Sequence, residues 1–297
     1  MAVQTSTTGQ LENASKEMIV TARYTEEHNA PTVALIERFT LEHGHDTLVV
    51  PKVSQITLDP LVEGVDIASE KDIGMTTISV GVGEIGGKVI ITDKLLRQNT
   101  QNIWRMIGKQ LGDGMARRKD RDVIALITNL NGGTLQGAAG ETLDVHAATG
   151  LVAFAKANRF GPLTELRAVF HPNQVMELSK SLATIGAATY AAGGPFNLQN
   201  ERLQSFYSNI RLGGIPFYET GNIDADANDD GIGAVFNSGA MGMVTQLQTS
   251  TERDRKPSLR AWELVIVSDY SAFEIDDTKG TGARYDQGDV STTGGAT

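Results

Sequence analysis

The spacing of apolar residues changes abruptly within the first half of the chain, and this change most limits the possible folds. Three segments before residue 93, TLVVPKVSQITL, MTTISV and KVIIT, are rich in β-branched residues and are separated by glycine, aspartate and proline, which is typical of strands. Beyond them Ile103, Ile107 and Leu111 recur at every fourth residue, which is typical of a helix. The sequence therefore predicts a long hairpin or extended arm, followed by one long helix around residues 103–126.

The remaining segments mix both spacings. Met18, Ile19 and Ala22, and then Val33, Ile36 and Phe39, recur at roughly helical intervals on either side of an Asn-Ala-Pro break, which predicts two short helices. Further helices are predicted near 152–157 and over 173–182. Strands are predicted at LRAVFHP, IPFYE, AVFNS, MGMVTQLQTS and LRAWELVIVSDYSAFEI. The chain is predicted to be α+β.

Composition excludes several classes of protein. The chain has 297 residues with no cysteine, which excludes disulfides and thiolate chemistry. The formal net charge of -10 argues against a protein whose main task is binding phosphates. No segment is apolar enough to span a bilayer or to act as a secretory signal, so neither a membrane location nor export is expected.

The string GVGEIGGKV places Gly81, Gly83 and Gly86 in the spacing of a dinucleotide-binding loop. Such a loop must open a helix whose amides face the phosphates, whereas KVIIT continues as a strand. The P-loop pattern also fails, because Gly87 stands where the lysine should be. We predict a hairpin turn or a flexible loop here, with a nucleotide enzyme as a minor alternative.

The run DADANDDGIG places Asp226, Asn228 and Asp230 at alternate positions, as in the first half of a calcium-binding loop. The second half is missing, because the twelfth position is Asn237 instead of glutamate and strand-like segments flank the run. We predict a solvated acidic turn, with weak calcium binding at these three residues as the alternative.

No catalytic arrangement stands out. His43 and His45 lack a second group of ligands elsewhere among only five histidines, and His171 beside Pro172 fits a structural role. No serine lies in a nucleophile-elbow string. We therefore predict no enzymatic activity, no metal site and no cofactor.

Basic residues gather on or near the long helix, in the run ARRKDR and just before it. In this acidic chain we expect them to form salt bridges with neighbouring subunits or a weak, salt-sensitive contact with DNA. The basic residues are Arg105, Lys109, Arg117, Arg118, Lys119 and Arg121.

The order of these segments resembles major capsid proteins of tailed double-stranded DNA phages over roughly residues 15–276. VVPKVSQITLDPLVEGVDIAS is similar to the family's entry into its extended loop, and ITDKLLRQNTQNIWRMIGKQLGDGMARRKDRDVIALI to the strand and spine helix that follow it. LRAVFHPNQVMEL, LGGIPFYETGNI, GAVFNSGAMGM and RAWELVIVSDYSAFEI resemble its later strands and helix. The resemblance implies a Hong Kong 97-like capsid fold with an N-terminal arm, an extended β-hairpin loop, a long spine helix, a peripheral domain and a central axial domain.

The resemblance also implies a division of the chain into five parts. These are an N-terminal arm with short helices at 1–45, the extended loop or β-hairpin at 46–92, the spine helix and peripheral domain at 93–150, a mainly axial domain at 151–250, and the closing strands of the peripheral domain with a C-terminal tail at 251–297.

The implied function is that of a major capsid protein. Copies would self-assemble into pentamers and hexamers of an icosahedral shell that encloses phage double-stranded DNA through weak, non-specific contact. The expected location is the virion capsid, after assembly in the host cytoplasm. The other expected partners are a portal, a decoration protein and a scaffolding protein, which we expect to be separate because only some fifteen residues precede the first helical pattern.

The resemblance and the charge pattern together suggest candidate assembly residues. These are Glu63, Gly64, Lys88, Arg105, Arg117, Arg118, Lys119 and Arg121. The alternatives are an encapsulin-type protein nanocompartment shell and, from a different class, a calcium-dependent binding protein.

Overall fold

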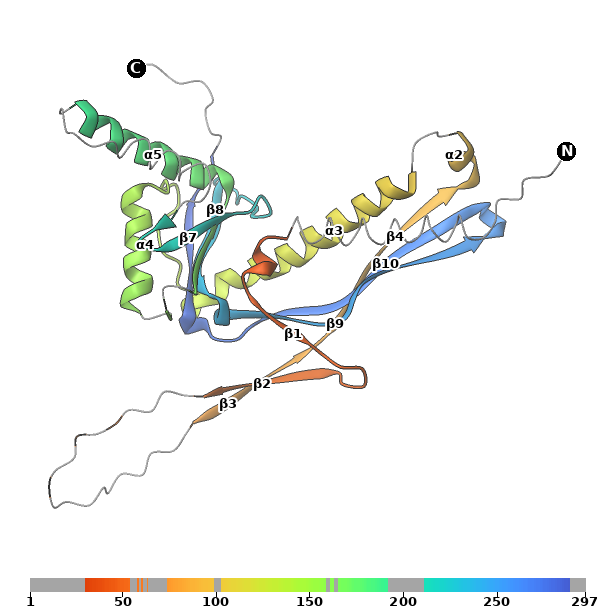
Figure 1. Ribbon diagram of the computed structural model, residues 1–297, viewed down its shortest axis with the longest axis horizontal. Coiled ribbons are helices and arrows are strands. Elements are labelled where there is room, and N and C mark those ends of the chain that lie inside the picture. The colour runs from red at the N-terminus through yellow and green to blue at the C-terminus, as the bar shows by residue number, and fades with distance from the viewer. Residues whose placement is uncertain are drawn as a thin grey trace.

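The computed structural model describes residues 30–53, 58, 60, 63, 74–98, 103–158, 161–162, 165–191 and 211–288. It shows one long helix between a four-stranded sheet and a five-stranded sheet, with a two-stranded hairpin that reaches away from both sheets (Figure 1). None of the described helices is long and apolar enough to cross a membrane. The mixture of helices and sheets confirms the predicted α+β class.

The long helix α3 (Ile103–Leu126) is continuous, as its four-residue apolar spacing predicts. Its buried side joins both sheets, because Met115 and Val123 lie in one apolar cluster with Phe236 of the five-stranded sheet and Ile266 of the four-stranded sheet. A single helix face therefore supplies the shared core of the subunit.

The four-stranded sheet has the order β1-β9-β10-β4. β9 and β10 form a long antiparallel hairpin, β4 pairs with β10 in antiparallel fashion, and the short β1 runs parallel to β9. Ile91 and Leu264 pack against Ile103 and Ile107, so α3 covers one side of this sheet. The strands are β1 (Glu37–Thr40), β4 (Gly83–Thr92), β9 (Met241–Lys256) and β10 (Ala261–Glu274), and the short helix α2 (Asp93–Gln98) follows β4.

The five-stranded sheet has the order β11-β8-β5-β7-β6 and is mixed, because β5 runs parallel to β7 and antiparallel to β8. Leu151 of α4 and Leu178 of α5 pack on Phe170 and Ile215 of this sheet. Figure 1 shows both helices beside the sheet, away from α3. The elements are α4 (Val145–Ala157), β5 (Leu166–Phe170), α5 (Pro172–Ala191), β6 (Arg211–Leu212), β7 (Ile215–Glu219), β8 (Asp230–Asn237) and β11 (Gly280–Asp286).

The hairpin consists of β2 (Thr47–Val53) and β3 (Met75–Gly81), which pair in antiparallel register from Thr47 opposite Gly81 to Val53 opposite Met75. The long β-branched hairpin predicted from the sequence is therefore present in the described residues. It forms a sheet of its own and is not continuous with the other two sheets.

The helix predicted over Val33, Ile36 and Phe39 is wrong. Thr32–Ala34 form only a 3-10 turn, η1, and strand β1 follows. A three-residue spacing fits a short helix as well as a turn followed by a strand, and the backbone pairing of Phe39 with β9 decides for the strand. The other predicted helix, around Met18, lies outside the described residues.

The glycine-rich string that follows β3 is extended and contains no hairpin turn. β4 begins at Gly83 and no helix follows the glycines, which confirms that the nucleotide-loop spacing is coincidental. The turn prediction is wrong because Val82 alone links β3, which pairs with β2, to β4, which pairs with β10. Gly86 permits the close approach of these strands, since a Cβ atom there would lie 2.7 Å from the carbonyl oxygen of Ile266.

The side chain of Asp120, in the C-terminal half of α3, is fully buried and joins three parts of the chain. Its Oδ1 accepts a hydrogen bond from the backbone N–H of Thr32 at 3.0 Å. Its Oδ2 accepts hydrogen bonds from the hydroxyl of Thr220 and the amide of Asn222, both at 2.8 Å. The carboxylate therefore fixes the turn before β1 and the loop after β7 on α3, and these donors offset the cost of burying its charge.

We expect Asp120→Ala to lower the free energy of unfolding by about 3 kcal/mol, because buried donors lose a charged acceptor. Urea unfolding of the unassembled subunit measures this loss. The control is Asp224→Ala, which removes the exposed partner of Arg121 and should cost less than about 1 kcal/mol. Equal losses in the two variants would contradict the assigned role of Asp120.

Candidate assembly surfaces

The two faces of the β2–β3 hairpin differ in their surroundings. Leu48, Val50, Ile78 and Val80 face inwards and join an apolar cluster that contains Phe273 of β10. The alternate residues face outwards, since successive side chains of a strand point to opposite sides. The outward residues Val49, Pro51, Met75, Thr77 and Ser79 are exposed and uncharged, with Val49 54% and Met75 61% exposed.

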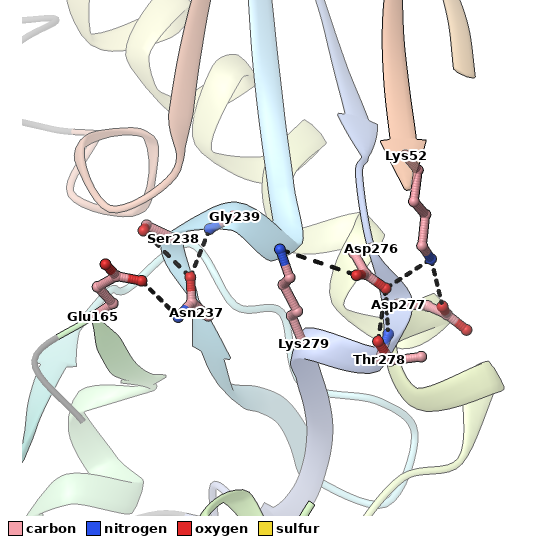
Figure 2. A network of polar contacts seen from close by, with 9 residues as sticks. All are labelled: Lys52, Glu165, Asn237, Ser238, Gly239, Asp276, Asp277, Thr278 and Lys279. Carbon is pink, nitrogen blue, oxygen red and sulfur yellow. Dashed lines mark hydrogen bonds and ion pairs between the residues drawn. The ribbon is translucent and has the colours of Figure 1, made fainter. Parts of the chain in front are cut away.

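Lys52 continues the inward row of β2 and reaches the loop between β10 and β11 (Figure 2). Its Nζ atom lies 2.7 Å from Oδ1 of Asp276 and 3.8 Å from Oδ1 of Asp277. The hydrogen bond to Asp276 raises the pKa of Lys52 above its usual value. Burial alone would raise the pKa of Asp276, but hydrogen bonds from Lys52 and Thr278 hold it below its usual value. The contact is therefore an ion pair at neutral pH.

The loop that carries Asp276 also ties the two larger sheets together. The backbone N–H groups of Ile275 and Asp276 both donate to the carbonyl oxygen of Ala240, at 2.9 and 3.1 Å. Ala240 ends the turn η3 (Ser238–Ala240), which links β8 to β9, and η5 (Asp277–Lys279) links β10 to β11. These two direct strand-to-strand crossings between the sheets therefore meet here, and Lys52 connects the hairpin to this point.

Sequence reasoning missed this contact. Lys52 and Asp276 are 224 residues apart, and no local spacing connects them. The available signal was that Lys52 is the one charge in the row of Leu48 and Val50, which suggests an inward lysine with an acidic partner.

Most of the predicted basic residues lie on the exposed side of α3. Nε of Arg118 lies 3.1 Å from Oδ1 of Asp122, whose other oxygen accepts the hydroxyl of Tyr270 at 2.8 Å. Attraction to the Asp122 carboxylate raises the pKa of Arg118. Arg121 contacts Asp224 at 2.5 Å. Arg105, Lys109 and Arg117 are exposed as well.

Lys119 does not belong to this exposed group, contrary to the prediction from the basic run. It is only 7% exposed, its Nζ atom lies 3.0 Å from the hydroxyl of Thr249, and the ring of Tyr270 faces it at 5.3 Å. Its position could have been predicted, because it lies four residues from Met115 and from Val123 and so shares their buried helix face. Lys119 therefore stabilises the subunit from inside.

The other candidate residues are separated from this helix surface. Lys88 contacts Glu263 of β10 at 2.9 Å, and Lys256 of β9 contacts the same carboxylate. Hydrogen bonds from Lys256 and Lys88 lower the pKa of Glu263. Glu263 thus links β4, β9 and β10 of this sheet, and Lys88 is one of its two partners. Glu63 is exposed, and Gly64 lies outside the described residues.

The acidic turn is held by its own backbone. Oδ1 of Asp226 accepts hydrogen bonds from the N–H groups of Asn228 and Asp230, at 2.8 and 3.1 Å. These hydrogen bonds hold the pKa of Asp226 below its usual value. Oδ1 of Asp230 accepts the N–H of Gly140 at 2.8 Å. Within the described ranges no group of three or more acidic or histidine side chains could hold a metal ion, and calcium binding here stays an untested prediction.

Comparison with known proteins identifies the family. The family model described as phage capsid protein matches residues 76–281 of the chain. This range includes α3, every strand of the four-stranded sheet except β1, and every strand of the five-stranded sheet except most of β11. No curated protein sequence matches the chain.

Solved structures share the fold at low sequence identity. The capsid of cyanophage Pam1 has a TM-score of 0.62 at 14% identity, with 84% of this chain and 89% of that chain covered. The head of Helicobacter pylori bacteriophage KHP40 has a TM-score of 0.61 at 10% identity, with 85% and 87% covered. A virus-like particle from Pyrococcus furiosus has a TM-score of 0.59 at 9% identity, with 90% and 98% covered.

These structural matches confirm the predicted Hong Kong 97-like fold. The family match confirms the predicted function at the level of a phage capsid protein, and the alternative functions have less support. By its sequence match over residues 76–281 and by its fold, the chain belongs to the phage capsid protein family.

Proposed function

We propose that the subunit assembles into pentamers and hexamers by laying the outward face of its β2–β3 hairpin on a neighbouring copy. The observation that carries this proposal is the exposed, uncharged row of Val49, Pro51, Met75, Thr77 and Ser79. A soluble subunit would ordinarily place charges on such a ribbon, because uncharged edge strands invite pairing with other chains. A surface of this kind suits burial against another copy.

The geometry of the ribbon supports the same proposal. Two-stranded hairpins are only marginally stable in water without a further surface to pack on. The inward side of this hairpin has such a surface near Val80 and Phe273, whereas its outward side has none among the described residues. A neighbouring copy would supply the missing surface and bury the apolar parts of Val49 and Met75.

We also propose that the exposed side of α3 makes the weak contact with packaged DNA. Lys109 and Arg117 are exposed, and neither forms an ion pair with a carboxylate in the part of the chain that the structure describes. The chain as a whole has a net charge of -10, so a few free cations would give a loose, salt-sensitive contact. The proposal also includes a separate scaffolding protein, a portal, a decoration protein and assembly in the host cytoplasm, as the family resemblance implies.

The encapsulin-type alternative predicts protein inside the shell where the capsid proposal predicts DNA. A calcium-dependent binding protein would rest on Asp226, Asn228 and Asp230. Calcium uptake in calorimetry, together with a stable monomer, would favour that second alternative.

The purified protein, alone or with its scaffolding protein, should form closed icosahedral particles or rings of five and six subunits. Electron microscopy and mass measurement test this expectation. A monodisperse monomer under all assembly conditions would contradict the proposal.

Val49→Glu should abolish shell formation, because the new carboxylate would be buried without a partner against the neighbouring copy. The matched control Val49→Thr keeps the β-branched shape without a charge and should assemble. Because Val49 is 54% exposed in the subunit, both variants should unfold within about 0.5 kcal/mol of the unchanged protein. Normal shells from Val49→Glu would show that this face is not an interface.

The double variant Lys109→Ala with Arg117→Ala should bind duplex DNA less tightly. The plot of log affinity against log salt has a negative slope, and its magnitude should decrease by about 2, because each lost phosphate contact contributes roughly 0.9. Fluorescence anisotropy at several salt concentrations measures the slope. The control Lys180→Ala removes a charge on α5 and should leave the slope unchanged. Equal slopes for the unchanged protein, the double variant and the control would contradict the proposed DNA contact.

A further inference from the structure

The described strands of the hairpin contain a single charged residue, Lys52. Its place in the strand is specific, because it follows Leu48 and Val50 on the inward face and is the first inward residue beyond their apolar cluster. The side chain therefore lies where packing between the hairpin and the body of the subunit ends. At this end of the ribbon, a polar contact in place of apolar packing holds the hairpin to the body of the subunit.

The acceptors of Lys52 are held firmly in the body. Oδ1 of Asp276, 2.7 Å from Nζ of Lys52, also accepts hydrogen bonds from the backbone N–H and the hydroxyl of Thr278. The backbone of Asp276 donates to Ala240 at the crossing between the sheets. Figure 2 shows Lys52 coming from its strand to this loop, with Asp277 beside it. Beyond its apolar cluster, the hairpin is thus connected through Lys52 to a loop that backbone hydrogen bonds hold in place.

The acidic residues around the contact stabilise the positively charged ammonium group of Lys52. Glu274, Asp276 and Asp277 supply three carboxylates, and Lys279 lies 4.0 Å from Asp276 on the side away from Lys52. The side chain of Lys52 is 34% exposed and that of Asp276 is 14% exposed. The contact is therefore accessible to salt and can open without unfolding the subunit.

We propose that Lys52 is a positioning residue whose ion pair with Asp276 and Asp277 sets the angle of the hairpin to the subunit, and that this angle sets the curvature of the shell. The second half rests on the assembly function proposed above. The seven paired residues of β2 extend roughly 23 Å, and Lys52 holds the end of this ribbon that is farthest from Thr47 and Gly81. Without the contact the ribbon can turn about its apolar cluster, which moves the outward face and changes where the neighbouring copy docks.

Three substitutions separate charge from packing. Lys52→Met keeps most of the apolar stem and removes the charge, Lys52→Arg keeps the charge, and Lys52→Glu places a carboxylate opposite three others. The chain has no cysteine, so Met75→Cys on the hairpin and Met176→Cys on α5 give two unique spin-label positions. Double electron–electron resonance on the unassembled subunit then reports the spread of hairpin angles directly.

We expect Lys52→Met and Lys52→Glu to broaden and shift the distance distribution, with the larger change in Lys52→Glu, and Lys52→Arg to preserve it. In assembly, Lys52→Met should give particles of mixed size or open sheets, and Lys52→Arg should restore uniform shells. Lys180→Met, which removes an ion pair within α5, is the matched control and should change neither measurement.

An unchanged distance distribution in Lys52→Met would overturn the assignment of Lys52. A changed distribution with normal, uniform shells would overturn the link between hairpin angle and curvature. If the unchanged protein forms no shells, the assembly proposal fails, and the resonance measurement still decides whether Lys52 holds the hairpin.

Discussion

The structure depends on the buried face of α3, because both larger sheets pack against it. Met115 and Val123 lie in one apolar cluster with residues of both sheets, so the two sheets share this part of their core. The same face contains Lys119 and Asp120, which are charged and buried. Their hydrogen bonds reach Thr249 of β9 in one direction and Thr220 after β7 in the other. Apolar packing therefore stabilises the association of the sheets with α3, while the two charged groups specify the position of each sheet on the helix.

The second constraint is that two of the crossings between the sheets, from β8 to β9 and from β10 to β11, lie at neighbouring points. The turns η3 and η5 are joined through Ala240, whose carbonyl oxygen accepts two backbone hydrogen bonds from Ile275 and Asp276. A rotation of one sheet relative to the other must strain or break these bonds. Lys52 binds the side chain of Asp276, so the hairpin is attached to this same junction between the sheets. A contact made on the hairpin by another copy can in this way act on the junction between the sheets.

Much of the fold could be predicted from the sequence, because its signals are local. Ile103, Ile107 and Leu111 locate α3, and alternating β-branched residues locate the strands. Predictions failed where pairing partners decide the structure, as at Phe39, which pairs with β9. The prediction for Lys119 failed because its charge was considered along the chain and not around the helix, so a contact with a neighbouring subunit or DNA was expected for a residue that is buried. Lys52 and Asp276 come together only through the tertiary fold, and no sequence spacing could have paired them.

The period of the strand explains how one ribbon can serve two opposite purposes. Residues at even positions from Leu48 to Lys52 bind the subunit itself, while Val49 and Pro51 remain uncharged and exposed. A slip of one residue in the pairing of β2 with β3 would exchange these faces, burying Val49 in place of Val50 and turning Lys52 to the outward face. The ion pair of Lys52 disfavours such a slip, because the outward position offers no carboxylate among the described residues. One lysine therefore helps to fix the register, and with it the chemical character of the surface that another copy would contact.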